Sequence, residues 1–254
     1  MTSRWRRWLG ASAPRERTSG RPPSANGASS FHLTWRWDGP APALARVAVD
    51  LTVLEPPRVP RLSFWALQAS FRDGTGRRYG GGHAGLQHHP RYPGGRAVNW
   101  GGYGPDGREL TGTESPLPSA LDNPNTRDLA WEPGRPHRIV IGRGDTGWAA
   151  WVDGGWIRDL HAGGDRLTDV VVWSEVFADC DAPSAAVRWS GWEGVTLDGS
   201  IVAPRAVETR YQAVTDGGCT NTSSEPDGAG GVVQRTAVAR RYGPGHVLPL
   251  TPPG

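Results

Sequence analysis

Apolar residues recur at every second position along most of this 254-residue chain, and this pattern limits the possible folds more than any other feature. Val47, Val49, Leu51 and Val53 are one such series. A period of two places apolar side chains on one face of an extended strand, whereas an amphipathic helix requires a period of 3.6. No window of 12 or more residues carries a helical stripe. The chain is therefore expected to consist of strands.

The same alternation recurs at intervals along the sequence. Further strands are expected at residues 65–71, 83–87, 97–100, 138–141, 148–152, 156–160, 170–177, 186–189, 206–214 and 232–239. Glycine, proline, aspartate and asparagine separate them, as is typical of turns. This arrangement predicts an all-β fold with two antiparallel sheets packed face to face, a jelly-roll or lectin-like sandwich with few or no helices.

Two hairpins are predicted from spacing. Residues 148–152 and 156–160 flank Asp153-Gly154-Gly155, where the glycines tolerate the positive φ of a tight turn. Residues 170–177 and 186–189 flank an eight-residue loop. Closing that loop symmetrically would place Glu175 opposite Arg188.

Composition divides the chain into three parts. Residues 1–30 contain six arginines, one acid and little to bury, so they are expected to form a disordered basic leader. Residues 31–242 carry the alternating pattern and are expected to form a single β-sandwich domain. Residues 243–254 are expected to form a flexible tail.

The sequence pI of 9.2 comes from the leader. The rest of the chain has 22 arginines against 24 acids, so the folded body is nearly neutral. Because nucleic acid is bound through a basic surface, it is not expected as a partner. The oligomeric state is left open.

The first residues lack the apolar run of roughly 7 to 15 residues that a secretory signal needs. This predicts cytoplasmic residence, or export from a start codon other than the one assigned. No stretch approaches the ~18 apolar residues of a membrane span, so no membrane partner is expected. Cys180 and Cys219 would form one disulfide in an exported protein and remain thiols in a cytosol.

Residues 73–107 crowd twelve glycines and three histidines into one segment with no regular apolar period. Such a segment is expected to be a long ordered loop or a broken hairpin that carries a working surface. A sugar site needs a flat aromatic ring with planar polar groups around it. The candidate ligand-binding residues are His83, Gln87, Arg96, Asn99, Trp100 and Tyr103. The alternative is that Trp100 and Tyr103 are ordinary core or lid aromatics.

No metal and no cofactor are predicted. His88 and His89 are adjacent, so on a strand only one of them can join His83 around an ion. All 28 basic residues are arginine, so the run Gly80-Gly81-Gly82 lacks the lysine of a phosphate-binding loop.

Four short motifs resemble an uncharacterised bacterial family. They are Gly82-His83-Ala84-Gly85-Leu86-Gln87, Ala97-Val98-Asn99-Trp100-Gly101-Gly102-Tyr103, Val172-Trp173-Ser174-Glu175-Val176-Phe177 and Asp216-Gly217-Gly218-Cys219. The resemblance covers roughly residues 31 to 241. It implies a concanavalin-A-like sandwich and no particular activity.

Glu175 is the candidate catalytic residue, because it shares a strand face with Trp173 and Phe177, where an acid is costly unless it is paired or used. A glycoside hydrolase needs two carboxyl groups about 5 to 10 Å apart. Asp153, Asp159 and Glu193 are the candidate partners. The Glu-x-Asp-x-x-Glu pattern of lectin-fold glucanases does not occur. An ion pair between Glu175 and Arg188 is the structural alternative.

Three functions follow from these observations. The leading hypothesis is a lectin-like protein that binds carbohydrate through the segment at residues 80–104. A glycan-cleaving hydrolase that uses Glu175 as general acid or base is the first alternative. A protein-interaction module with exposed tryptophans and arginines is the second. Whether the protein is an enzyme is left open.

Overall fold

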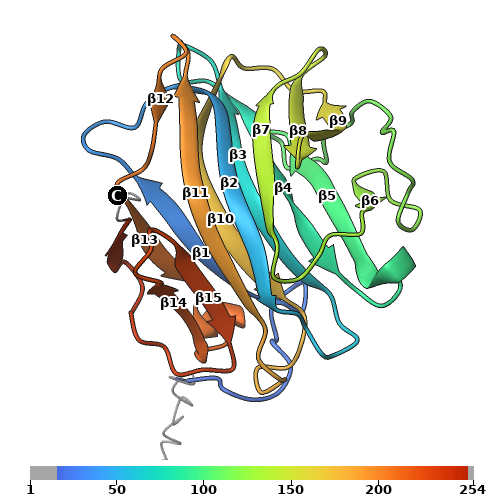
Figure 1. Cartoon of the computed structure of the whole chain (residues 1–254), viewed down its shortest axis with the longest axis vertical. Coiled ribbons are helices and arrows are strands. Elements are labelled where there is room, and N and C mark those ends of the chain that lie inside the picture. The colour runs from blue at the N-terminus through green and yellow to red at the C-terminus, as the bar shows by residue number, and fades with distance from the viewer. Residues whose placement is uncertain (1–15, 251–254) are drawn as a thin grey trace, which may run out of the picture.

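The computed structural model describes residues 16–250, which form two antiparallel β-sheets packed face to face (Figure 1). Sheet I runs in the order β14 (Thr222–Pro226), β15 (Val232–Thr236), β11 (Ala186–Thr196), β2 (Leu44–Glu55), β7 (Pro136–Arg143), β8 (Trp148–Val152) and β9 (Gly155–Leu160), with β12 (Ile201–Val202) beside β11. Sheet II runs in the order β16 (Val247–Pro249), β13 (Ala206–Tyr211), β1 (Ser29–Arg36), β10 (Arg166–Val176), β3 (Ser63–Arg72), β4 (Arg78–His88), β5 (Arg96–Tyr103) and β6 (Thr126–Asp128).

Helical structure in the described part of the chain is limited to two 3-10 turns, η1 (Pro93–Gly95) and η2 (Val214–Asp216). The predicted all-β sandwich is confirmed. Because residues 16–250 contain no long helix, none of their helices is suited to crossing a membrane.

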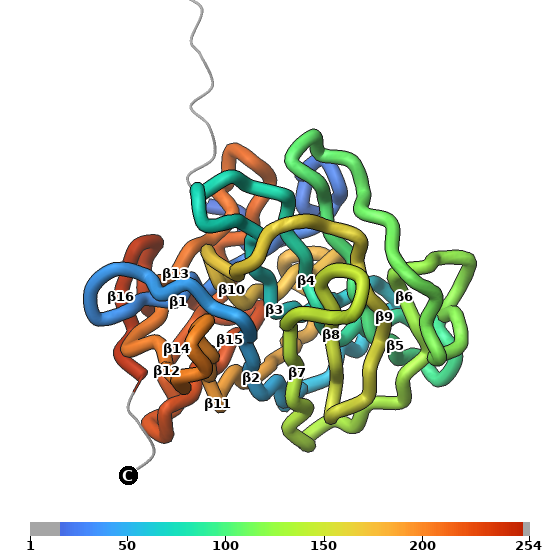
Figure 2. Tube along the Cα trace, turned by 90° about the horizontal axis from the view of Figure 1, so that it is seen from above, coloured from blue at the N-terminus to red at the C-terminus, as the bar shows by residue number. Residues whose placement is uncertain are grey.

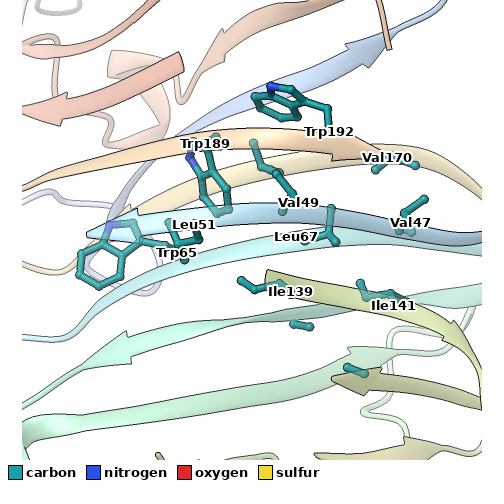
Figure 3. Packing of buried hydrophobic residues seen from close by; sticks show 14 of the residues in the cluster. Val47, Val49, Leu51, Trp65, Leu67, Ile139, Ile141, Val170, Trp189 and Trp192 are labelled. Carbon is teal, nitrogen blue, oxygen red and sulfur yellow. The ribbon is translucent and has the colours of Figure 1, made fainter. Parts of the chain in front are cut away.

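The core lies between the sheets and is built by the alternating residues. Val47, Val49 and Leu51 of β2 face Leu67 of β3 in Figure 3, and all four are buried. Across the same layer the ring of Trp148 stacks on Phe71 with centroids 5.1 Å apart. The period-two pattern therefore works as expected, with one parity of each strand turned into a shared apolar layer.

One predicted hairpin is confirmed and the other is wrong. β8 and β9 pair directly, and the turn between them has positive φ at Asp153 and Gly154. β10 and β11, by contrast, do not pair with each other: β10 pairs with β1 and β3, and β11 pairs with β2 and β15. The two strands are neighbours in sequence, but the loop between them crosses from one sheet to the other. The two sheets are joined at one edge by a single pair between β10 and β2, Leu167 with Leu44.

Both terminal regions are more ordered than expected. Of the expected leader, residues 1–15 lie outside the described residues, while residues 16–28 are hydrogen-bonded to the body and Ser29 begins β1. Of the expected tail, residues 247–249 form β16, which pairs with β13, and Leu250 is buried. In each region backbone hydrogen bonds outweigh a composition that is typical of disorder.

The glycine-rich segment is a regular hairpin of β4 and β5, paired from Gly81–Tyr103 to His88–Arg96. Gly76, Gly94, Gly95 and Gly107 have positive φ and serve turns, whereas Gly82 is explained by close packing. A Cβ on Gly82 would lie 2.5 Å from Cη2 of Trp100 and 2.9 Å from Cζ of Phe71. Glycine is required there because the Trp100 ring lies directly against the backbone of β4.

Candidate functional site

The face of sheet II that points away from the core carries an unusual set of side chains. Registered pairing places Ser30, Glu175 and Phe64 side by side on β1, β10 and β3. The neighbouring row contains His32, Trp173 and Ala66, and the next contains Gln68 beside His83. This face is therefore polar and aromatic, although it belongs to the most central strands of the sheet.

Trp173 is the centre of this face. Because its neighbour Ala66 is small, the indole packs in a cluster with Ala66 and Phe64, with a Phe64 ring centroid 4.8 Å away. The rings of His83 and His32 lie 5.8 and 6.4 Å from the indole. Trp173 thus forms the floor on which the surrounding polar groups stand.

Glu175 stands at one end of the floor. Asn26 Nδ2 donates a hydrogen bond of 2.9 Å to its Oε1. Burial raises the pKa of the Glu175 carboxyl, and the Asn26 hydrogen bond lowers it in part. The predicted ion pair with Arg188 is wrong, since Arg188 pairs with Asp227 on the other sheet.

The two histidines of this face are neutral near pH 7. Burial lowers the pKa of His83 to about 4. Burial, and then the charge of Arg210, lower the pKa of His32 to about 4. A neutral imidazole offers one hydrogen-bond donor and one acceptor, which suits recognition of a hydroxyl group.

A groove of about 670 Å³ runs over this face. Its lining includes Asn26, Ser30, His32, Phe64, Gln68, Arg78, Gly81, His83, Tyr103, Trp173 and Glu175. One wall is the loop after β5, with Gly104, Pro105 and Gly107, and this loop rises on the outer side of sheet II in Figure 2. The Tyr103 ring at the start of that loop is 54% exposed and lies 6.3 Å from His83.

The structure separates the six candidate ligand residues. His83 and Tyr103 line the groove together with Glu175. Trp100 is fully buried between the sheets, so its ring cannot reach a ligand in this groove. Arg96 donates a hydrogen bond of 2.9 Å to the carbonyl oxygen of Trp131 and lies over that indole.

The remaining two candidates lie on the outer face but are covered. Asn99 donates to Thr126 Oγ1 at 2.9 Å, and Gln87 accepts a hydrogen bond of 2.8 Å from the Tyr92 hydroxyl. Both side chains are buried. Asn99 thus bonds to β6 and Gln87 to the turn between β4 and β5, and neither residue lines the groove.

The predicted carboxylate partners of Glu175 do not lie in the groove. Asp153 lies at the β8–β9 turn and is hydrogen-bonded to His137 of β7. Asp159 is buried on β9, and Glu193 forms an ion pair with Arg46 on sheet I. Of the described residues that line the groove, Glu175 is the one carboxylic acid. Likewise, no three His, Cys, Asp or Glu side chains within residues 16–250 gather closely enough to hold a metal ion.

Five polar residues of the groove were not among the sequence candidates: Asn26, Ser30, His32, Gln68 and Arg78. A signal existed for Gln68. It is the one polar side chain in the run from residue 64 to residue 69 of β3, on the parity opposite to Trp65, Leu67 and Ala69. For Asn26 no signal existed, because it reaches Glu175 only through the folding of the segment before β1.

A scan against protein-family models and a search of curated proteins both found no match, so the family resemblance stays a prediction. Solved structures with some likeness include a scytalido-glutamic peptidase with a peptide-based transition-state analogue (TM-score 0.48, 10% identity, 81% of this chain and 97% of that chain). Others are a carbohydrate-binding module from Bacillus subtilis (TM-score 0.34, 10% identity, 63% and 88%) and a lichenase from a mouse hindgut metagenome (TM-score 0.34, 9% identity, 84% and 78%). At such identities no ligand or reaction carries over to this chain.

Proposed function

We propose that the groove on the outer face of sheet II binds carbohydrate. The observation that carries this proposal is the exposed Tyr103 ring beside the neutral imidazole of His83, over a groove lined by further polar groups. Tyrosine offers a flat apolar face for sugar C–H groups. The His83 ring and the Gln68 amide supply hydrogen bonds to hydroxyl groups around it.

An array of neutral and acidic glycans, probed with the full chain, tests this proposal. The best array ligand is then titrated against Tyr103→Ala and Tyr103→Phe. Phenylalanine keeps the ring and serves as the matched control. Binding should fall roughly five- to tenfold with alanine and stay within about twofold of wild type with phenylalanine, because the stacking of the ring contributes about 1 to 1.5 kcal/mol. No binding across the array would remove the proposal.

A second candidate function is glycan hydrolysis with Glu175 as general acid or base. The observation that favours it is the burial that raises the pKa of Glu175, because a general acid must keep its proton near the working pH. The absence of a second carboxylic acid from the groove lining speaks against the usual two-carboxylate mechanism. Release of reducing ends from a polysaccharide, abolished in Glu175→Gln, is the outcome that this candidate requires.

The Cys180–Cys219 disulfide bears on the compartment. Disulfides persist in oxidising environments and are rare in a cytosol. It therefore favours export over cytoplasmic residence. Alkylation of protein taken directly from its native cells tests this, since blocked disulfide cysteines gain no label and free thiols gain two. For the third hypothesis, a protein-interaction module, no comparable observation exists.

A further inference from the structure

The segment at residues 16–28, which we call the strap, supplies one residue of the groove wall, Asn26, from outside the sheets. It lies ahead of β1 and reaches the groove through Asn26, on the side where Glu175 stands. The strap contains no strand, so its position depends on a small number of individual contacts.

Asn26 is oriented by the strap itself. Its Oδ1 accepts a hydrogen bond of 3.1 Å from the backbone N–H of Ala28, while the Ser24 hydroxyl donates at 2.5 Å to Ala28 O and lies 3.1 Å from the same Oδ1. With the oxygen committed in this way, the amide nitrogen faces Glu175 and donates at 2.9 Å. The hydrogen bond from Asn26 to Glu175 therefore forms only when the strap has this conformation.

The other end of the strap is clamped by two loops. Cys180 N–H donates to Gly20 O at 2.9 Å, and Gly20 N–H donates to Asp181 Oδ1 at 3.0 Å. From the second loop, Thr220 N–H donates to Arg17 O at 2.7 Å. Each loop thus holds the strap through its backbone.

The disulfide joins these two loops directly. Cys180 and Cys219 form a disulfide, with their Cα atoms 5.6 Å apart. Cys180 itself donates to Gly20 O, and Cys219 directly precedes Thr220, which donates to Arg17 O. Asn221 adds to the clamp, because its Nδ2 donates both to Cys180 O at 2.7 Å and to Thr18 O at 3.2 Å. One covalent bond therefore fixes the spacing of both loops that hold the strap.

From this arrangement we infer that the Cys180–Cys219 disulfide controls the groove by holding the strap, so that reduction releases Asn26 from Glu175 and opens that wall. A dithiol is the required reductant: it is oxidised to its own disulfide while Cys180 and Cys219 become thiols. The inference rests on the proposed function for the ligand of the groove. The release of the strap does not depend on it.

Hydrogen exchange of the full chain tests the release without a ligand. In the double variant Cys180→Ser/Cys219→Ser, peptides that cover residues 17–28 should exchange at least tenfold faster, at exchange times at which peptides of β3 are still protected in both proteins. Unchanged exchange in the strap would overturn the inference. If β3 also loses protection at these times, the whole fold has opened. The variant Asp181→Ala then tests whether the loop contacts hold the strap.

Asp181→Ala removes the acceptor for Gly20 N–H and leaves the disulfide intact. Faster exchange confined to the strap supports the clamp, and wild-type exchange overturns it. A binding arm uses the best ligand from the glycan array, with at least fivefold weaker binding expected in the double variant. If the wild type binds no glycan, the proposed function fails while the exchange result stands. If glycan binds equally well to the wild type and to the double variant, the strap does not control the groove.

Discussion

The indole N–H of Trp173 donates a hydrogen bond of 3.0 Å to Oε1 of Gln68, across the pair of strands β10 and β3. This bond fixes the Gln68 amide with its oxygen toward Trp173. The amide N–H groups are then left for the groove, which Gln68 lines. Trp173, the floor of the candidate site, therefore positions the Gln68 amide in the groove.

Gln68→Leu should destabilise the protein by about 1 to 2 kcal/mol, because the mostly buried Trp173 N–H loses its acceptor. Gln68→Glu keeps an acceptor for this N–H and serves as the control. Its free energy of unfolding at pH 7 should stay close to wild type. Urea denaturation followed by tryptophan fluorescence measures both. Equal losses in the two variants would show that the hydrogen bond is not the cause.

Glu175→Gln should leave the free energy of unfolding at pH 7 unchanged or raise it by up to about 1 kcal/mol. Burial disfavours the charged carboxylate, whereas the neutral amide keeps an oxygen for Asn26. Thermal and urea unfolding check this. A large loss of stability would instead indicate that the charge of Glu175 is paired.

Gly82→Ala should cost about 1 to 3 kcal/mol, because the added methyl group would overlap the Trp100 and Phe71 rings. Gly243→Ala is the control, since a Cβ there meets no atom within 4 Å. That substitution should change stability by no more than about 0.5 kcal/mol. Chemical denaturation of the two variants separates a packing requirement from a general effect of losing glycine.

The depressed pKa values of the two groove histidines predict a loss of stability on acidification. An imidazole whose pKa falls from 6.5 to about 4 binds fewer protons in the folded state between these pH values. The contribution of the neutral imidazole to the free energy of unfolding is complete above pH 6.5 and is lost as the pH falls toward 4. The raised pKa of Glu175 acts oppositely: its contribution is present below pH 4.5 and is lost as the pH rises through the folded value.

The variant His83→Gln removes the part of the pH dependence of stability that comes from the His83 imidazole. Between pH 7 and pH 5, wild type should lose on the order of 1 to 2 kcal/mol more than this variant, with His32 still titrating in both. Urea denaturation at the two pH values measures the difference. An equal pH dependence in the two proteins would mean that His83 titrates normally, which NMR of its ring protons verifies independently.

Loss of the disulfide should cost about 4 kcal/mol, from the loop-closure entropy of the 39-residue separation between Cys180 and Cys219. The free energy of unfolding of the Cys180→Ser/Cys219→Ser variant in urea gives this value. Oxidised and reduced wild type provide a second comparison with no change of sequence. A loss below about 1 kcal/mol in both comparisons would contradict the prediction.

Parity along a strand contained more information about the site than composition did. Trp100 and Tyr103 differ in parity on β5, so on one strand their side chains must face opposite ways. Tyr103 lines the groove, and Trp100 fills the core together with Val98. The strand expected from the sequence ended at residue 100, so this constraint was not applied to Tyr103. The abundance of glycine suggested a loop, yet Gly82 is needed because of a packed ring and not because of a turn.

The alternation of apolar residues was enough to determine that this chain forms strands with one buried face, and hence a two-layer sandwich. Strand parity is a local property, because successive side chains of any extended backbone point in opposite directions. Which strands become neighbours is not local. Only the tertiary structure placed β10 beside β3, gave Glu175 the amide of Asn26 in place of Arg188, and brought His83, Tyr103 and Glu175 to one groove. Sheet order depends on the packing of the whole core, and no short stretch of sequence contains that information.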